Sequence, residues 1–189
     1  MKRRDVLAIS LLGFGAGAQA AYSLDHLMAE LAAYPGGRAH FVERRFLALL
    51  DKPVVATGEL IYSPPDRLEK RTLLPKPETL VLDKDTLTIE RDKRRLSISL
   101  RSRPEAQAFV ESIRATLSGN RAALEQHYIL RLQGSSAQWT LTLVPTDPAI
   151  LSLLQRITVT GNKGQVRLID YLQADGDRSE LAIEPIDPP

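Results

Sequence analysis

One segment of alternating apolar and polar residues, 39–74, constrains the fold more than any other part of the sequence. Two extended runs are joined through Pro53, and a Pro64-Pro65 corner leads into a third. Successive side chains of a strand point to opposite faces of its sheet. If the three runs are strands, one face therefore carries the large apolar residues Phe41, Leu60, Tyr62 and Leu68. That face must be covered by other parts of the chain or filled by a ligand.

The same period of two continues beyond this segment. Runs at 79–82, 86–90 and 95–100 alternate aliphatic with polar residues and are separated by short charged turns, a pattern typical of half-buried antiparallel strands. Five more extended runs follow a helical interval, at 128–132, 137–144, 157–160, 165–173 and 179–183. The sequence therefore predicts about eleven strands.

Two segments have helical periodicity instead. Ser23 is a candidate N-cap for a first helix, and a second helix can begin at Pro104, with a short third helix after Asn120. The apolar stripe of the first helix is Leu24, Leu27, Met28 and Leu31, and that of the second is Ala106, Phe109, Val110, Ile113 and Leu117. Because the helices interrupt the strands rather than alternate with them, the pattern predicts an α+β fold.

Strongly twisted open sheets seldom exceed about ten strands without curling, splitting or closing. An incomplete antiparallel β-barrel, with the helices lidding its concave side, would cover the apolar faces of both kinds of element. A flatter sheet over a solid core is the alternative. We find no internal repeat or linker, so residues 21–189 are expected to form a single domain.

Residues 1–20 have the features of a cleaved signal peptide. Lys2, Arg3 and Arg4 precede an apolar run, and Ala18-Gln19-Ala20 has the small-x-small form of a cleavage site. A short membrane anchor is the alternative, but the run is shorter than the roughly 20 residues that span a bilayer. Export by the Sec route, or by Tat given the Arg3-Arg4 pair, would place the protein in the periplasm.

Charge and cysteine content restrict the function further. Without residues 1–20 the chain has 22 basic and 22 acidic residues, and this neutral balance argues against nucleic acid as the partner. The sequence has no cysteine, so its stability must come from a packed core rather than from disulfides.

No catalytic or metal-binding motif stands out. His26, His40 and His127 lack the spacing of a metal site, and Ser135-Ser136 lacks the GxSxG context of a nucleophile. We therefore expect no metal, no cofactor and no enzymatic activity. A hydrolase using Ser135, Ser136 and His127 is the weakest of the functional hypotheses.

The apolar faces are the remaining functional signal. An aliphatic lining suits either a packed core or a bound acyl chain, since burying each CH2 contributes about 0.8 kcal/mol without directional partners. A carrier would use one face of the strands as its cavity and the helices as its lid. The predicted cavity residues are Phe41, Leu60, Tyr62, Leu68, Leu80, Leu82, Leu87, Ile89, Leu96, Ile98, Trp139, Leu141 and Leu143, and the predicted lid residues are Leu27, Leu31, Phe109 and Ile113.

The order of these elements resembles the LolA family of periplasmic outer-membrane lipoprotein carriers. The resemblance spans essentially the whole mature chain, and the positions that match the family pattern are Phe41, Gly58, Leu60, Pro65, Leu68 and Pro75. The resemblance implies an incomplete barrel whose hydrophobic cavity shelters acyl chains of a lipoprotein or lipid-linked amphiphile. It further implies a monomeric chaperone, an inner-membrane donor and an outer-membrane acceptor, without catalysis or cofactor. The alternative is an interaction module that docks to an envelope complex without bound lipid.

Two positions depart from the family pattern. Pro64 stands where the family has an arginine that helps hold the lid closed, and Lys70 stands where an aromatic residue is usual. In these respects the chain is more similar to the divergent LolA-related proteins associated with aryl polyene or xanthomonadin pigment clusters. This resemblance implies a specialised lipid or lipid-linked pigment as cargo.

Overall fold

The structure, a computed structural model, describes residues 22–186, so the signal peptide predicted at 1–20 lies outside the described residues. The described chain forms eleven strands, four α-helices and a short 3-10 helix. In chain order they are α1 (Leu24–Ala32), β1 (Gly37–Phe46), β2 (Val54–Ser63), β3 (Arg67–Leu74), β4 (Glu78–Asp83), β5 (Thr86–Arg91), β6 (Arg94–Ser99), η1 (Leu100–Ser102), α2 (Pro104–Leu117), α3 (Arg121–Glu125), β7 (Tyr128–Ser135), β8 (Gln138–Pro145), α4 (Pro148–Leu151), β9 (Leu154–Asn162), β10 (Gln165–Gln173) and β11 (Arg178–Pro185).

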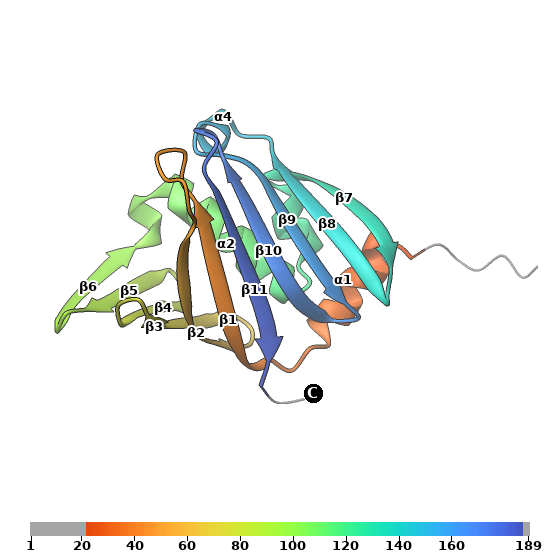
Figure 1. The fold of residues 1–189 in the computed structure, drawn as a ribbon. Coiled ribbons are helices and arrows are strands. Elements are labelled where there is room, and N and C mark those ends of the chain that lie inside the picture. The colour runs from red at the N-terminus through yellow and green to blue at the C-terminus, as the bar shows by residue number, and fades with distance from the viewer. Residues whose placement is uncertain (1–21, 187–189) are drawn as a thin grey trace, which may run out of the picture.

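All eleven strands belong to one antiparallel sheet with the order β6-β5-β4-β3-β2-β1-β11-β10-β9-β8-β7. Most neighbours are consecutive hairpins, and the pairing of β1 with β11 joins the two ends of the chain. The sheet is strongly curved but β6 and β7 remain as open edges (Figure 1). The predicted α+β fold with an incomplete antiparallel barrel is confirmed.

α1 and α2 lie on the concave side of the sheet, whereas α4 lies at its rim, between β8 and β9 (Figure 1). Ser23 caps α1 as predicted, since its Oγ accepts a hydrogen bond from the His26 backbone N–H at 3.2 Å. α2 and α3 follow β6 and precede β7, so the chain crosses the concave side as it passes from one edge of the sheet to the other. Within residues 22–186, none of the helices combines the length and apolarity needed to span a bilayer.

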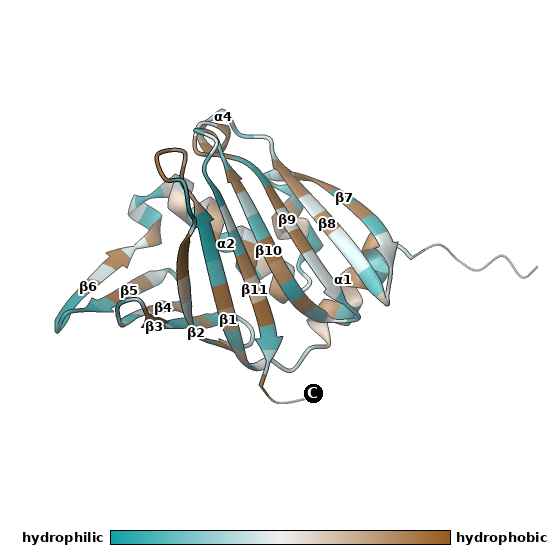
Figure 2. Ribbon diagram, viewed as in Figure 1, coloured by the Kyte–Doolittle hydropathy of each residue, from teal (hydrophilic) through white to brown (hydrophobic). Residues whose placement is uncertain are grey.

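A packed core occupies one half of the concave side. Trp139, Leu141 and Leu143 of β8 are fully buried there against the stripe of α1, of which Leu27 and Leu31 are almost inaccessible. The alternation that places these residues inward is visible along the strands in Figure 2 as bands of hydrophobic and hydrophilic residues. We call the part of the molecule formed by β7–β9 and α1 the filled half.

Candidate functional site

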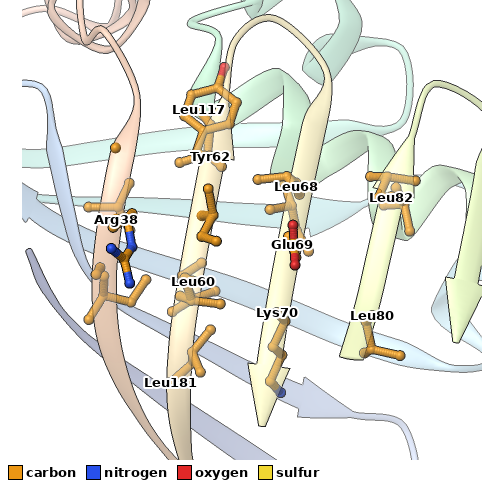
Figure 3. Close-up of a pocket in the computed structure, with 18 of the residues that line it drawn as sticks. Arg38, Leu60, Tyr62, Leu68, Glu69, Lys70, Leu80, Leu82, Leu117 and Leu181 are labelled. Atoms are coloured by element: carbon orange, nitrogen blue, oxygen red, sulfur yellow. The ribbon is translucent and has the colours of Figure 1, made fainter. Parts of the chain in front are cut away.

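A cavity of about 450 Å³ lies between α2 and the other half of the sheet. This volume falls within the range of about 300–1,000 Å³ that is typical of small-molecule sites. Its wall comes from β1–β5, β10 and β11, and most of its lining is aliphatic or aromatic (Figure 3). We call this part of the molecule the open half.

Register explains why the wall is apolar. Directly paired residues of neighbouring strands point to the same face of a sheet. Tyr62 pairs with Leu68, Leu68 with Leu82, and Leu82 with Leu87, which forms one apolar row across four strands. The next row runs from Leu60 of β2 through Lys70 of β3 to Leu80 of β4.

α2 forms the roof of the cavity. Phe109, Val110, Ile113 and Leu117 line it from one face of the helix, as the helical period predicts. Further along the sheet, where α2 lies over β9 and β10, the remaining gap is only about 10 Å³. A space of this size is at the lower limit for one water molecule, so the cavity ends where the filled half begins.

An ion pair lies in this apolar lining. Lys70 occupies the row between Leu60 of β2 and Leu80 of β4 (Figure 3), and its Nζ lies 2.6 Å from Oε2 of Glu43 on β1. Nζ also lies 5.0 Å from the centroid of the Phe41 ring, which it passes over. Ser179 donates a second hydrogen bond to the carboxylate of Glu43, at 3.2 Å.

Gly58 makes room for this arrangement. It pairs directly with Phe41, and a Cβ at this position would lie 1.9 Å from the backbone carbonyl oxygen of Arg71 and 2.9 Å from Cε1 of the Phe41 ring. Such approaches are closer than packed atoms tolerate, so both the neighbouring strand and the ring need a residue without a side chain here. The glycine at this family position therefore accommodates β3 and the Phe41 ring that lies under Lys70.

Tyr171 of β10 adds a hydroxyl group to the cavity lining. Its ring packs against Phe109 of α2 with centroids 5.1 Å apart. Burial, and secondarily the negative charge of Glu43, raise the pKa of Tyr171, so the phenol is neutral at physiological pH.

The structure brings part of the predicted site together. Eight of the seventeen predicted residues line the cavity, namely Leu60, Tyr62, Leu68, Leu80, Leu82, Leu87, Phe109 and Ile113. Their contact with a ligand stays a prediction.

The other nine predicted residues do not line this cavity. Phe41 is buried beneath Lys70, and Ile98 lies beyond Leu87 towards the sheet edge. Ile89 and Leu96 line a separate, more open hollow at the β5–β6 hairpin, where Leu96 remains 57% exposed. The remaining five, Trp139, Leu141, Leu143, Leu27 and Leu31, belong to the filled half, where they are almost completely buried in one apolar cluster.

Several lining residues were missed by the sequence analysis. Val110 and Leu117 belong to the predicted apolar face of the second helix and could have been included. Val166 and Ile169 of β10 both contribute to the lining although they are three residues apart, because the register shifts between Val166 and Leu168. A β-bulge of this kind changes which residues face inward, and simple alternation does not predict it.

The two departures from the family pattern have different surroundings. Pro64 lies at the β2–β3 corner against the turn that follows α1, where a Cβ on Gly36 would be 2.6 Å from the proline Cδ. A proline side chain has no polar group with which to hold a helix. Lys70, in contrast, points into the cavity region and has a defined partner.

The serine and histidine of the hydrolase hypothesis are far apart. Ser135 ends β7 and His127 precedes its first residue, which separates them by roughly 25 Å at the rise of an extended strand. Ser136 instead donates a hydrogen bond to Glu30 of α1, at 2.6 Å. These groups therefore cannot act together on one substrate. Within residues 22–186, no three histidine or acidic side chains gather closely enough to hold a metal ion.

The solved structures that are similar to this chain differ widely from it in sequence. A LolA superfamily protein from Nitrosomonas europaea is 10% identical, with 87% of this chain and 93% of that chain covered and a TM-score of 0.42. A chain of the MucA/MucB complex of Pseudomonas aeruginosa is 14% identical, with 88% of this chain and 56% of that chain covered and a TM-score of 0.44. The lipoprotein LppX of Mycobacterium tuberculosis is 11% identical, with 85% of this chain and 97% of that chain covered and a TM-score of 0.38.

No curated protein is significantly similar to the chain in sequence. A family match, however, extends over residues 16–183 and therefore includes every helix and all strands up to most of β11. The family is described as outer membrane lipoprotein carrier protein LolA-like. A match of this extent covers both the cavity wall and its roof, and the chain belongs to the LolA-like family of outer membrane lipoprotein carrier proteins.

Proposed function

We propose that the protein is a non-enzymatic periplasmic carrier that shelters the acyl chains of a lipoprotein or lipid-linked amphiphile and passes them towards the outer membrane. The observation that carries this proposal is the apolar cavity beneath α2, in a chain of the LolA-like family. An aliphatic lining suits a hydrocarbon chain, because each buried CH2 contributes about 0.8 kcal/mol and needs no hydrogen-bond partner.

The position of α2 supports a role as lid. The helix supplies Phe109, Val110, Ile113 and Leu117 to the lining, so any movement of α2 away from the sheet would expose the cavity. The chain on either side of α2 leads, through η1 and α3, to β6 and β7, which are the two edge strands of the sheet. A cargo chain would enter between α2 and the strands of the open half.

Export is part of the proposal. Cleavage after Ala20 would yield a mature protein of residues 21–189, a single domain in the periplasm. The mass of the protein recovered from the periplasm tests this step. Recovery of a protein that retains residues 1–20 at the membrane would favour the anchor instead.

The experiment for cargo binding is native mass spectrometry of the purified protein with an added diacylated lipopeptide. We expect a one-to-one complex with the wild-type protein. Val110→Trp places a large ring in the cavity and should weaken binding by about tenfold or more, equivalent to about 1.4 kcal/mol. Ile129→Trp is the matched control, because Ile129 is 53% exposed on β7, and it should bind like the wild type.

An interaction module without bound lipid is the second candidate. It predicts a solid core beneath all the helices, whereas the open half has a cavity of about 450 Å³. Failure of the wild-type protein to take up any acylated ligand would overturn the carrier and leave this candidate.

A further inference from the structure

The Lys70–Glu43 pair is the unexplained feature of the cavity. A site that holds only hydrocarbon gains nothing from charged groups in its wall. Replacing a buried ion pair by apolar residues of similar volume is often neutral or stabilising. The pair nevertheless lies among Leu60, Leu80 and Phe41, with a charge separation of 2.6 Å. Its presence indicates that something polar on the cargo meets this part of the wall.

The hydrogen-bonding capacity of the pair identifies what that group can be. Both carboxylate oxygens of Glu43 have a partner, because Oε2 accepts from Lys70 and Oε1 accepts from Ser179. The Lys70 ammonium has three N–H donors. Among the described residues it donates to Glu43 alone, so donors remain available beside the cavity.

The Tyr171 hydroxyl offers a second donor. It lines the same cavity, and Tyr171 lies directly opposite Ser179 in the β10–β11 pairing, so the tyrosine is near the Glu43 end of the wall. In the described part of the chain, this hydroxyl makes no hydrogen bond to another residue. Tyr171 is half-buried, and a ligand bound in the cavity could accept a hydrogen bond from its hydroxyl.

The charges in the cavity wall distinguish two polar groups that the cargo could carry there, a carboxylate and a carbonyl. The positive and negative charges of Lys70 and Glu43 cancel. A cargo carboxylate would place a second negative charge near Glu43 in apolar surroundings, where like charges repel strongly. A carbonyl oxygen accepts hydrogen bonds without adding charge.

On the basis of the proposed carrier function, we propose that Lys70, with Tyr171, donates hydrogen bonds to the ester or amide carbonyl of the cargo's acyl chain inside the cavity. Lys70 and Tyr171 are then the residues that distinguish an acylated cargo from a free fatty acid or a plain hydrocarbon. Glu43 holds the ammonium in place.

Three probes of equal chain length test this inference: methyl laurate, dodecane and laurate. Each is titrated against the purified protein, and displacement of bound Nile red is measured. We expect methyl laurate to bind about tenfold more tightly than dodecane, the effect of one hydrogen bond to a charged donor. Laurate should bind less tightly than its methyl ester.

The double variant K70M/E43L removes the pair and leaves no unpaired charge. It should lose the preference for methyl laurate over dodecane and still bind dodecane. Y171F should reduce the same preference to a smaller extent. R95Q/E90Q removes an exposed ion pair of 3.2 Å on β5–β6 and is the matched control, with an unchanged preference.

Each contrary outcome has a distinct meaning. Equal binding of methyl laurate and dodecane by the wild type, or an unchanged preference in K70M/E43L, contradicts the carbonyl site and leaves the carrier function intact. Tightest binding of laurate contradicts the choice of an uncharged group. Binding of none of the three probes contradicts the carrier function itself.

Discussion

Trp139 illustrates how a single residue determines its surroundings in the filled half. The indole is fully buried, and its Nε1 donates a hydrogen bond to the Lys163 carbonyl oxygen at 2.8 Å. Gly161 lies opposite it on β9, where a Cβ would be 2.1 Å from the backbone carbonyl oxygen of Gln165 and 2.5 Å from Cζ2 of the indole. The glycine is therefore needed because both the neighbouring strand and the indole approach its position closely.

Gly161→Ala should accordingly lower the free energy of unfolding by about 1–3 kcal/mol, the usual cost of overpacking a core. Urea denaturation measures the change. In a Trp139→Phe background the smaller ring relieves the part of the crowding that the indole causes, so the same substitution should cost less, while the close approach of the Gln165 carbonyl oxygen remains. An equal cost in both backgrounds would assign the crowding to that carbonyl oxygen alone.

At the residue scale, the direction of a side chain can be predicted from its own strand, whereas its contacts with distant strands cannot. Alternation in β3 places Lys70 on the same face as Leu68, so its inward direction follows from the sequence. Its partner does not, because Glu43 is two strands away and Lys70 reaches it by passing over Phe41. Lys70 is therefore recognisable from the sequence as unusual, whereas its ion pair with Glu43 is not.

At the scale of elements, one carboxylate links α1 to the sheet in addition to the apolar stripe of the helix. Glu30 accepts hydrogen bonds from Ser136 at the β7–β8 turn, at 2.6 Å, and from Tyr22, at 2.7 Å. Burial acts to raise the pKa of Glu30, but these hydrogen bonds outweigh it and hold the pKa below the ordinary carboxyl value of 4.5. A carboxyl group whose pKa is lowered on folding stabilises the fold above its ordinary pKa, and this contribution is lost as the pH falls through the lowered value.

Ser136→Ala should therefore destabilise the protein by about 1.5–3 kcal/mol at neutral pH, the range for a hydrogen bond to a charged group. The difference from wild type should shrink once the pH is well below the ordinary carboxyl pKa. Urea denaturation at both pH values measures it. Ser102→Ala is the control, since Ser102 donates to the Ser99 carbonyl oxygen and its loss should not depend on this titration. A pH-independent effect of Ser136→Ala would contradict the role of Glu30.

The elements themselves were largely predictable, because capping residues and periodicity are local. The Ser23 cap, the helix beginning at Pro104 and the eleven strands all follow from such signals. The run predicted as a strand at 95–100 ends one residue early, because Leu100 turns inward and begins η1. Its backbone N–H donates to the Asp85 carbonyl oxygen at 2.8 Å, a contact between turns that periodicity does not show.

At the scale of the whole molecule, the concave surface of the sheet is packed as a core in one half and borders a cavity in the other. α1 and β7–β9 fill one half, and α2 leaves a cavity over the other. The sequence predicts the common face but not the division, because Leu141 of β8 and Leu80 of β4 occupy equivalent positions in similar alternating strands. Only the placement of the helices over the sheet distinguishes them.

The same leucine-to-alanine substitution should therefore affect mainly stability in the filled half and mainly ligand binding in the open half. Leu141→Ala in the filled half should cost about 2–5 kcal/mol of unfolding free energy, because a fully buried side chain leaves an empty space among packed neighbours. Leu80→Ala should cost less, since Leu80 already borders a cavity. It should instead weaken the binding of methyl laurate, because contacts with the hydrocarbon chain are lost. Urea denaturation and Nile red displacement measure the two effects in parallel, and similar losses of stability at both positions would mean that the open half is packed as tightly as the filled half.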